Sequence, residues 1–178
     1  MMLACSGKVS TEGNLENQIP ANATIQDYVS IEGLQRATVK DGDITLAEGD
    51  FLNGRHQGTW TTYDATGKVS SISTYLNGLK QGVELTFDNL GYVSTKSYFH
   101  QDQLNGEYLV YKRRKIVERR NYYAGNLNGK FQRFYENGTV MEESTYSQGK
   151  IDGIARWYDS HGNLKVEYTY DQGQLIEN

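Results

Sequence analysis

From residue 51 to the end of the chain, the sequence repeats itself with a period of about 24 residues. We set the register on a glycine that ends the first loop of every unit. It recurs at Gly58, Gly82, Gly106, Gly129 and Gly153, in steps of 24, 24, 23 and 24 residues. Self-similarity at a fixed period is typical of repeat architectures, so it constrains the fold more than any single motif does.

Further positions recur at fixed distances from this glycine. An aromatic residue follows it by five positions, at Tyr63, Phe87, Tyr111, Phe134 and Tyr158. A second glycine follows by nine, at Gly67, Gly91, Gly138 and Gly162, with Lys115 as the exception. An aliphatic residue follows by eleven (Val69, Val93, Val117, Val140, Leu164) and an aromatic by seventeen (Tyr75, Phe99, Tyr123, Tyr146, Tyr170). The last two sets are an even number of residues apart, which predicts that they share one face of their strand.

Each unit is typical of two short antiparallel strands. In the first unit, we expect a strand over 59–63, a turn over 64–67 and a second strand over 68–75. Asn77-Gly78 favours a turn with positive φ before the next unit. Two strands per unit leave no room for a crossover helix. The sequence therefore predicts an all-β fold, a single-layer antiparallel β-meander of about 10–12 strands and roughly 50 Å in length.

The remaining residues suggest a cap and a leader. Residues 35–50 are expected to form a capping hairpin, with Asp41-Gly42 as a type I′ turn. Residues 1–34 are interpreted as the remnant of a leader and a flexible tether, and residues 51–178 as five repeats.

Composition and charge narrow the possible functions. The net charge of −4 argues against nucleic-acid binding, which needs a basic surface. The three histidines fall at different positions of different units, and no known catalytic or phosphate-binding motif is present. We therefore expect a non-enzymatic protein without catalytic residues, cofactor or metal. The recurring aromatic positions leave open the alternative of a carbohydrate or choline binder, since ligand cages are built from convergent aromatic rings.

One segment breaks the acidic composition. The third unit contains Lys112, Arg113, Arg114, Lys115, Arg119 and Arg120, which are 6 of the 18 Lys and Arg residues. We expect them at one hairpin tip, as a binding site for an acidic protein or for anionic lipid headgroups. The alternative is a solvated hairpin that discourages edge pairing.

The single cysteine lies near the start of the sequence. Met2-Leu3-Ala4-Cys5 resembles the lipobox of bacterial lipoproteins, which makes Cys5 a candidate for lipidation. Four residues precede Cys5, whereas a secretion signal contains an apolar stretch of about 7–15 residues. Two interpretations stay open: a lipoprotein whose true start lies upstream, or a cytosolic chain with an exposed thiol.

The repeat resembles a known family. The pattern of an aromatic residue, Asn or Gln before a glycine, a second aromatic residue and Asp-x-x-Gly is similar to the bacterial variant of the MORN repeat, over residues 51–178. The resemblance implies a protein-interaction or membrane-associated scaffold, anchored at the cell envelope if Cys5 carries a lipid. Related tandem repeats occur in proteins described as YwqK-type antitoxins, which implies as an alternative a cytosolic antitoxin that binds a partner toxin.

Overall fold

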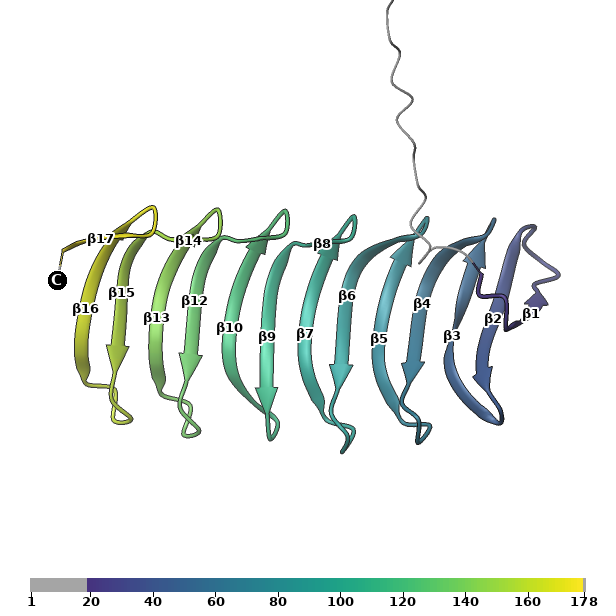
Figure 1. Ribbon diagram of the computed structural model, residues 1–178, viewed down its shortest axis with the longest axis horizontal. Helices are drawn as coiled ribbons and strands as arrows, with labels where there is room; N and C mark the ends of the chain where they lie inside the picture. Colours follow the sequence, from purple (N-terminus) through teal and green to yellow (C-terminus); the bar gives the residue numbers. More distant parts are fainter. Residues whose placement is uncertain (1–18, 178) are drawn as a thin grey trace, which may run out of the picture.

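The chain folds into one antiparallel sheet in which each long strand pairs with the next long strand along the chain (Figure 1). The computed structural model describes residues 19–177. Within this range there are 17 strands. Their bounds are β1 (Ala23–Asp27), β2 (Leu34–Asp41), β3 (Ile44–Leu52), β4 (Arg55–Tyr63), β5 (Val69–Leu76), β6 (Leu79–Phe87), β7 (Val93–His100), β8 (Gln103–Leu104), β9 (Gly106–Lys112), β10 (Lys115–Tyr123), β11 (Asn126–Leu127), β12 (Gly129–Phe134), β13 (Val140–Ser147), β14 (Lys150–Ile151), β15 (Gly153–Tyr158), β16 (Leu164–Asp171) and β17 (Gln174–Glu177).

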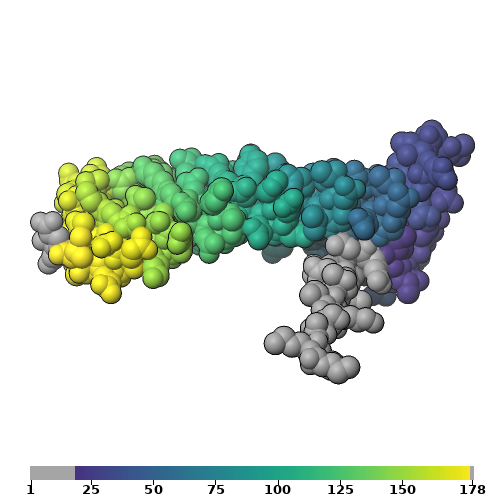
Figure 2. Space-filling view, turned by 90° about the horizontal axis from the view of Figure 1, so that it is seen from above, coloured from purple at the N-terminus to yellow at the C-terminus, as the bar shows by residue number. Residues whose placement is uncertain are grey.

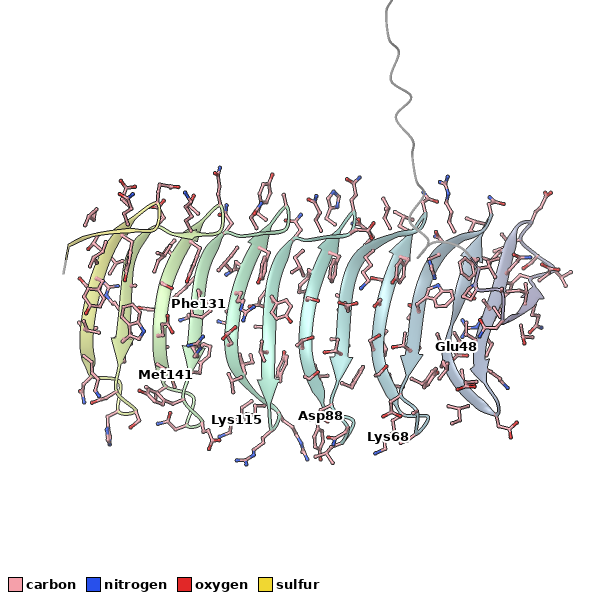
Figure 3. The ribbon with its side chains drawn as sticks, viewed as in Figure 1. Glu48, Lys68, Asp88, Lys115, Phe131 and Met141 are labelled. Atoms are coloured by element: carbon pink, nitrogen blue, oxygen red, sulfur yellow. The ribbon has the colours of Figure 1, made fainter. Side chains whose placement is uncertain are left out.

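The predicted all-β, single-layer meander is confirmed. Figure 2 shows a long, narrow body, and Figure 3 shows side chains along the whole sheet. There are more strands than the 10–12 predicted, partly because β8, β11 and β14 are two-residue segments set off from the longer strands that follow them. Strand β1 also lies within residues 1–34, which we had assigned to the tether; residues 23–27 pair with β2.

Tight turns join the units along the upper edge of the sheet in Figure 1. In these upper turns both central residues have positive φ, as at Asn77 (52°) and Gly78 (88°), which is the type I′ geometry that matches strand twist. In the five upper turns that follow the first repeat, the second residue donates its N–H to a carbonyl near the preceding upper turn: Gly78 to His56, Asp102 to Lys80, Gly125 to Leu104, Gly149 to Leu127 and Gly173 to Ile151, at 2.8–3.1 Å. The upper turns therefore form a continuous hydrogen-bonded row from unit to unit.

The residue before the first glycine of a unit supports this row through its side chain. The Oε1 atom of Gln57 accepts the N–H of Asn77 at 3.1 Å, and Gln81 accepts the N–H of Gln101 at 3.2 Å. In the last unit, Asp152 accepts the N–H of Gln172 at 3.4 Å. The glutamine or aspartate before the glycine thus has a structural role in joining these units.

The lower turns, at the bottom edge in Figure 1, link the two strands of each unit. In the first unit, the carboxylate of Asp64 accepts the N–H of Thr66 at 2.8 Å and the N–H of Lys68 at 3.1 Å. Asp159 does the same for His161 and Asn163, both at 2.9 Å. Figure 3 shows Lys68, Asp88 and Lys115 along this edge. These aspartates explain the Asp-x-x-Gly part of the repeat, because a carboxylate satisfies turn amides that no strand can reach.

We expect the turn at Asp159 to make stability depend on acid pH. Hydrogen bonds from the side chain and backbone of Asn163, then from His161, lower the pKa of Asp159 from 3.8 to about 2. Because the folded-state pKa is lowered, this stabilisation is complete above pH 4 and is lost as the pH falls from about 4 to about 2. The melting temperature of wild type should exceed that of Asp159→Ala at pH 6, and the difference should shrink to a small part of this value near pH 2. A difference that is unchanged at pH 2 would contradict this assignment.

A β-bulge near the start of the second strand of each unit decides which residues share a face. In the first unit, Gly58 lies opposite Tyr75 and Thr62 opposite Ser71, but Tyr63 lies opposite Val69, which leaves Ser70 as the extra residue. The hydroxyl of Thr62 is 2.7 Å from that of Ser70 and 2.6 Å from that of Ser71. We call the face of Trp60 and Tyr75 face A and the opposite face, with Tyr63 and Val69, face B.

The prediction that the aliphatic and the second aromatic sets share a face is therefore wrong. Even spacing fails because the bulge inserts one residue between Val69 and Ser71 and reverses the alternation. Both faces carry aromatic residues, Trp60 and Tyr75 on face A and Tyr63 on face B.

In the third unit, the structure also changes which residues are equivalent to those of the first unit. Gly106 lies opposite Tyr122, and Tyr111 lies opposite Ile116. Tyr122 and Ile116 are thus the equivalents of Tyr75 and Val69, in place of the predicted Tyr123 and Val117. The residue missing from this unit is missing from its lower turn, so every later position shifts by one, and Tyr123 is 67% exposed.

A cluster of buried apolar side chains lies at the N-terminal end of the sheet. Ala37 and Phe51 are fully buried, Trp60 is 6% exposed, and Ile19 packs against this cluster. The predicted capping hairpin is formed by β2 and β3, but its turn residues are Gly42 and Asp43, between the paired Asp41 and Ile44. Only Gly42 has positive φ (57°), which fits type II′ and corrects the predicted type I′ turn.

Candidate functional site

The lower turn of the third unit differs from the others in length and in backbone conformation. Lys112 and Lys115 are paired, so the turn consists of Arg113 and Arg114 alone. Both arginines have positive φ, 51° and 66°, which is type I′ geometry. Asn and Gly are preferred at these positions, and other residues there are strained by about 1 kcal/mol each. We call residues 112–115 the basic turn.

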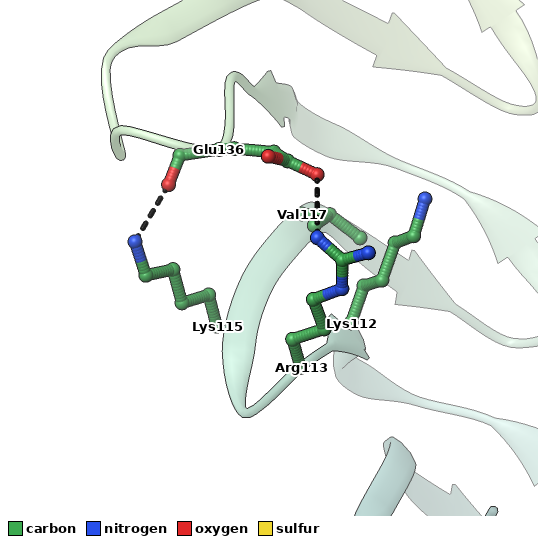
Figure 4. A pocket seen from close by; sticks show the side chains of 5 residues that line it. All are labelled: Lys112, Arg113, Lys115, Val117 and Glu136. Carbon is green, nitrogen blue, oxygen red and sulfur yellow. Dashed lines mark hydrogen bonds and ion pairs between the residues drawn. The ribbon is translucent and has the colours of Figure 1, made fainter.

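Three side chains of the basic turn contact the lower turns of the neighbouring units, and Figure 4 shows the two that reach Glu136. Arg113 forms an ion pair with the carboxylate of Glu136 at 3.5 Å, and the Nζ atom of Lys115 donates to the backbone carbonyl of Glu136 at 2.8 Å. On the other side, Arg114 donates to the hydroxyl of Tyr92 at 2.8 Å, with its guanidinium 4.3 Å from the ring centroid. The long cationic side chains thus span the space that the shorter turn leaves between its neighbours.

These contacts are exposed. The side chains of Arg113 and Glu136 are 80% and 75% accessible to solvent. Within residues 19–177, Lys112 has no hydrogen-bond or ion-pair partner. Four positive charges therefore stand against the single carboxylate of Glu136, and the edge of the sheet is locally basic in an acidic chain.

A small pocket lies beside the basic turn. It has a volume of about 140 Å³ and is lined by Lys112, Arg113, Lys115, Val117 and Glu136 (Figure 4). Val117 is the bulged residue of β10, since pairing resumes at Ile116 on one side of it and at Glu118 on the other. A more open groove of about 530 Å³ lies nearby, lined among others by Tyr111, Ile116 and Phe134.

Arg119 and Arg120 lie in β10 and not in the turn itself, so the six predicted residues do not form one hairpin tip, although Arg119 lines the open groove together with Arg114 and Lys115. Arg119 pairs with Glu107 at 3.0 Å. Arg120 pairs with Glu118 and lies over the ring of Tyr108, 5.5 Å from its centroid. The two arginines are adjacent in a strand and so point to opposite faces. Both act within the sheet, whereas Lys112, Arg113, Arg114 and Lys115 extend from its edge.

An ionic row on face A was not predicted from the sequence. Glu118 accepts ion pairs from Arg120 and, at 3.3 Å, from Arg133, which also reaches Glu142 at 3.2 Å. The Glu118 side chain is 12% exposed and that of Glu142 is 16% exposed. Glu136 and Tyr92 were also missed. The signal was available, because Tyr92 precedes Arg114 by 22 residues and Glu136 follows Arg113 by 23, so each pair joins consecutive units.

The other predicted sites have these outcomes. Cys5 lies outside the described residues. Residues 19–177 contain no group of three or more His, Cys, Asp or Glu side chains that could hold a metal ion. None of their segments is a helix long and apolar enough to cross a membrane.

Comparisons with known proteins give limited similarity. No curated protein matches this sequence. Among solved structures, a mutant of S. aureus TarM in complex with Fondaparinux, alpha-GlcNAc-glycerol and UDP matches at 11% identity and a TM-score of 0.29, covering 89% of this chain and 22% of that chain. A second TarM structure matches at 12% identity and a TM-score of 0.28, covering 89% and 21%. The chain spans about a fifth of the length of these proteins, and TM-scores this low support no conclusion on fold or function.

Sequence comparison does find a repeat family. The family model described as the MORN repeat variant matches residues 57–77, 127–148 and 151–172. The first segment covers most of β4 and β5 with the upper turn that follows, and the other two cover the fourth and fifth units. The expected resemblance is therefore confirmed for three of the five units: these are similar to the MORN repeat variant.

Proposed function

We propose that this protein is a non-enzymatic interaction module, which uses the basic turn to dock an acidic segment of a partner protein. The observation that carries the proposal is the placement of Arg113 and Arg114 at two positions where the backbone favours Asn and Gly. Elsewhere in residues 19–177 the same turn type ends in glycine at Asn53-Gly54, Asn77-Gly78, Ala124-Gly125, Gln148-Gly149 and Gln172-Gly173, and lacks glycine at Gln101-Asp102. In that turn Asp102 has a structural role, because its carboxylate accepts the N–H of Lys80 at 2.6 Å. Strained residues persist where they serve a function, and two adjacent arginines at a sheet edge offer charge and hydrogen-bond donors to a ligand.

The internal contacts of the basic turn are weak enough to leave it available. An exposed ion pair contributes about 0–1 kcal/mol, so the pair between Arg113 and Glu136 can exchange for one with a partner at little loss. The contact between Arg114 and Tyr92 is a cation–π contact at an exposed site, worth about 0.5–1 kcal/mol. Tyrosine and arginine are the residues that contribute most often to the centres of protein interfaces.

The test replaces Arg113 by Asn and Arg114 by Gly, which is the sequence of the turns at residues 53–54 and 77–78. If the arginines serve binding, the double variant should melt at the same temperature as wild type or higher, because turn strain is relieved as the charges are lost. Its affinity for a fluorescein-labelled octaglutamate peptide, measured by fluorescence polarisation, should fall by about tenfold at low salt.

A matched control carries the same change in charge at another place. Lys150→Gln with Lys165→Gln removes two exposed positive charges from β14 and β16 and should leave peptide affinity within about twofold. If the turn variant is destabilised by more than about 1 kcal/mol and binds as well as wild type, the arginines are structural and the proposal is wrong. If the wild type does not bind the peptide but binds vesicles of anionic lipid, the proposal of a protein ligand is wrong and the basic turn binds a membrane surface.

We also propose, from the sequence pattern around Cys5, that the module is held at the bacterial cell envelope by a lipid. The measurement is mass spectrometry of the N-terminal peptide of the native protein after phase partitioning with detergent. A lipidated Cys5 in the detergent phase supports an envelope scaffold. An unmodified Cys5 in the aqueous phase would overturn the anchor and favour the cytosolic antitoxin.

A further inference from the structure

The surroundings of the basic turn indicate which kind of acidic segment fits it. Arg113 already binds one carboxylate, that of Glu136, at 3.5 Å, and Lys115 binds the carbonyl of the same residue at 2.8 Å. An acidic residue and its backbone are thus held by two cations in the free protein. The arrangement is a template for how an acidic polypeptide can lie against this turn.

The pocket beside these contacts adds an apolar requirement. Its lining is Val117 together with the side chains of Lys112, Arg113, Lys115 and Glu136, whose aliphatic stems are apolar. A cavity of about 150 Å³ accepts a benzene molecule, so a pocket of about 140 Å³ has room for one leucine-sized side chain. The pocket opens between the lower turns of the third and fourth units, next to the carboxylate of Glu136 (Figure 4).

The charges and the pocket together indicate the kind of polypeptide segment that fits this site. We infer that the pocket takes one bulky apolar side chain of an acidic segment, while a neighbouring carboxylate of that segment replaces Glu136 on Arg113. This inference rests on the proposed docking function of the basic turn. Charge complementarity selects an acidic ligand, and the size of the pocket selects an apolar residue within it. Glu136 then acts as an internal competitor that is displaced on binding.

The test uses two labelled peptides, octaglutamate and the same peptide with leucine at its fourth position. Wild type should bind the leucine peptide about tenfold more tightly, because burying a leucine adds to the charge interaction. Glu136→Gln should bind both peptides about two- to fivefold more tightly than wild type, because the competing carboxylate is gone. Val117→Phe should fill the pocket and abolish the preference for leucine.

Controls separate this inference from the proposed function. Glu32→Gln removes an exposed negative charge outside the repeats and should leave both affinities within twofold of wild type. If wild type binds both peptides equally, the pocket is not a subsite. If Glu136→Gln binds no more tightly than wild type or the control, the carboxylate is not displaced. If neither peptide binds wild type, the docking function itself fails, and this inference fails with it.

Discussion

Replacing Gly49 by alanine is expected to lower the free energy of unfolding by about 3 kcal/mol, because the new methyl group has no space. A Cβ atom at Gly49 would lie 2.3 Å from Cδ2 of Trp60 and 2.4 Å from Cε2. The Trp60 ring is 6% exposed and its Nε1–H donates to the carbonyl of Asp50 at 2.9 Å. The ring packs edge-on against Phe51 and His56, with centroids 5.0 and 4.3 Å away, so it cannot move without breaking this cluster.

The measurement is chemical denaturation followed by tryptophan fluorescence and circular dichroism. A double-mutant cycle provides the control: Trp60→Ala alone should be destabilised by about 3–5 kcal/mol, but adding Gly49→Ala to it should have almost no further effect. If Gly49→Ala is as harmful without the ring as with it, the steric explanation is wrong.

Replacing Glu118 by alanine is the second change with a large expected effect. Glu118 joins Arg120 and Arg133, and its side chain is 12% exposed. Removing it leaves Arg120, whose side chain is 35% exposed, and Arg133, whose side chain is 47% exposed, without their shared carboxylate. We expect a loss of about 2 kcal/mol, since a hydrogen bond to a charged group contributes about 1.5–3 kcal/mol.

Glu136→Ala is the matched control, because it also removes a glutamate paired with arginine. Its side chain is 75% exposed, so we expect a loss below about 1 kcal/mol. Urea denaturation of both variants measures the two losses in the free energy of unfolding. Equal losses would show that the row on face A is no more important to stability than an exposed ion pair.

The fold could be predicted because the residues at its turns are types that favour those turn conformations. Asn77-Gly78 and Asp64 lie at positions where a type I′ turn and a capped turn are needed, and both form. The faces could not be predicted as well. The extra residue of the bulge, such as Ser70, carries no distinguishing side chain, so spacing along the strand gave the wrong face for Val69.

The basic residues of the site could be predicted from the sequence, but their positions and partners could not. A run of charges in the sequence does not show which members are neutralised, because their partners lie one unit away. The partner of Arg113 is in the next unit and that of Arg114 is in the preceding one, whereas Arg120 pairs within its own strand with Glu118. The third unit is one residue shorter than the others, and the sequence does not show whether the deletion lies in the turn or in a strand. Only its place in the turn shows that Arg113 and Arg114 alone form that turn.

The antiparallel pairing of the strands sets the spacing of the lower turns along their edge of the sheet. Each unit adds two strands, so successive lower turns lie roughly 10 Å apart. An extended polypeptide covers that distance with about three residues. An extended ligand lying along this edge therefore meets a new turn at about every third residue. Inserting or deleting a whole unit changes the number of turns but not the distance between them.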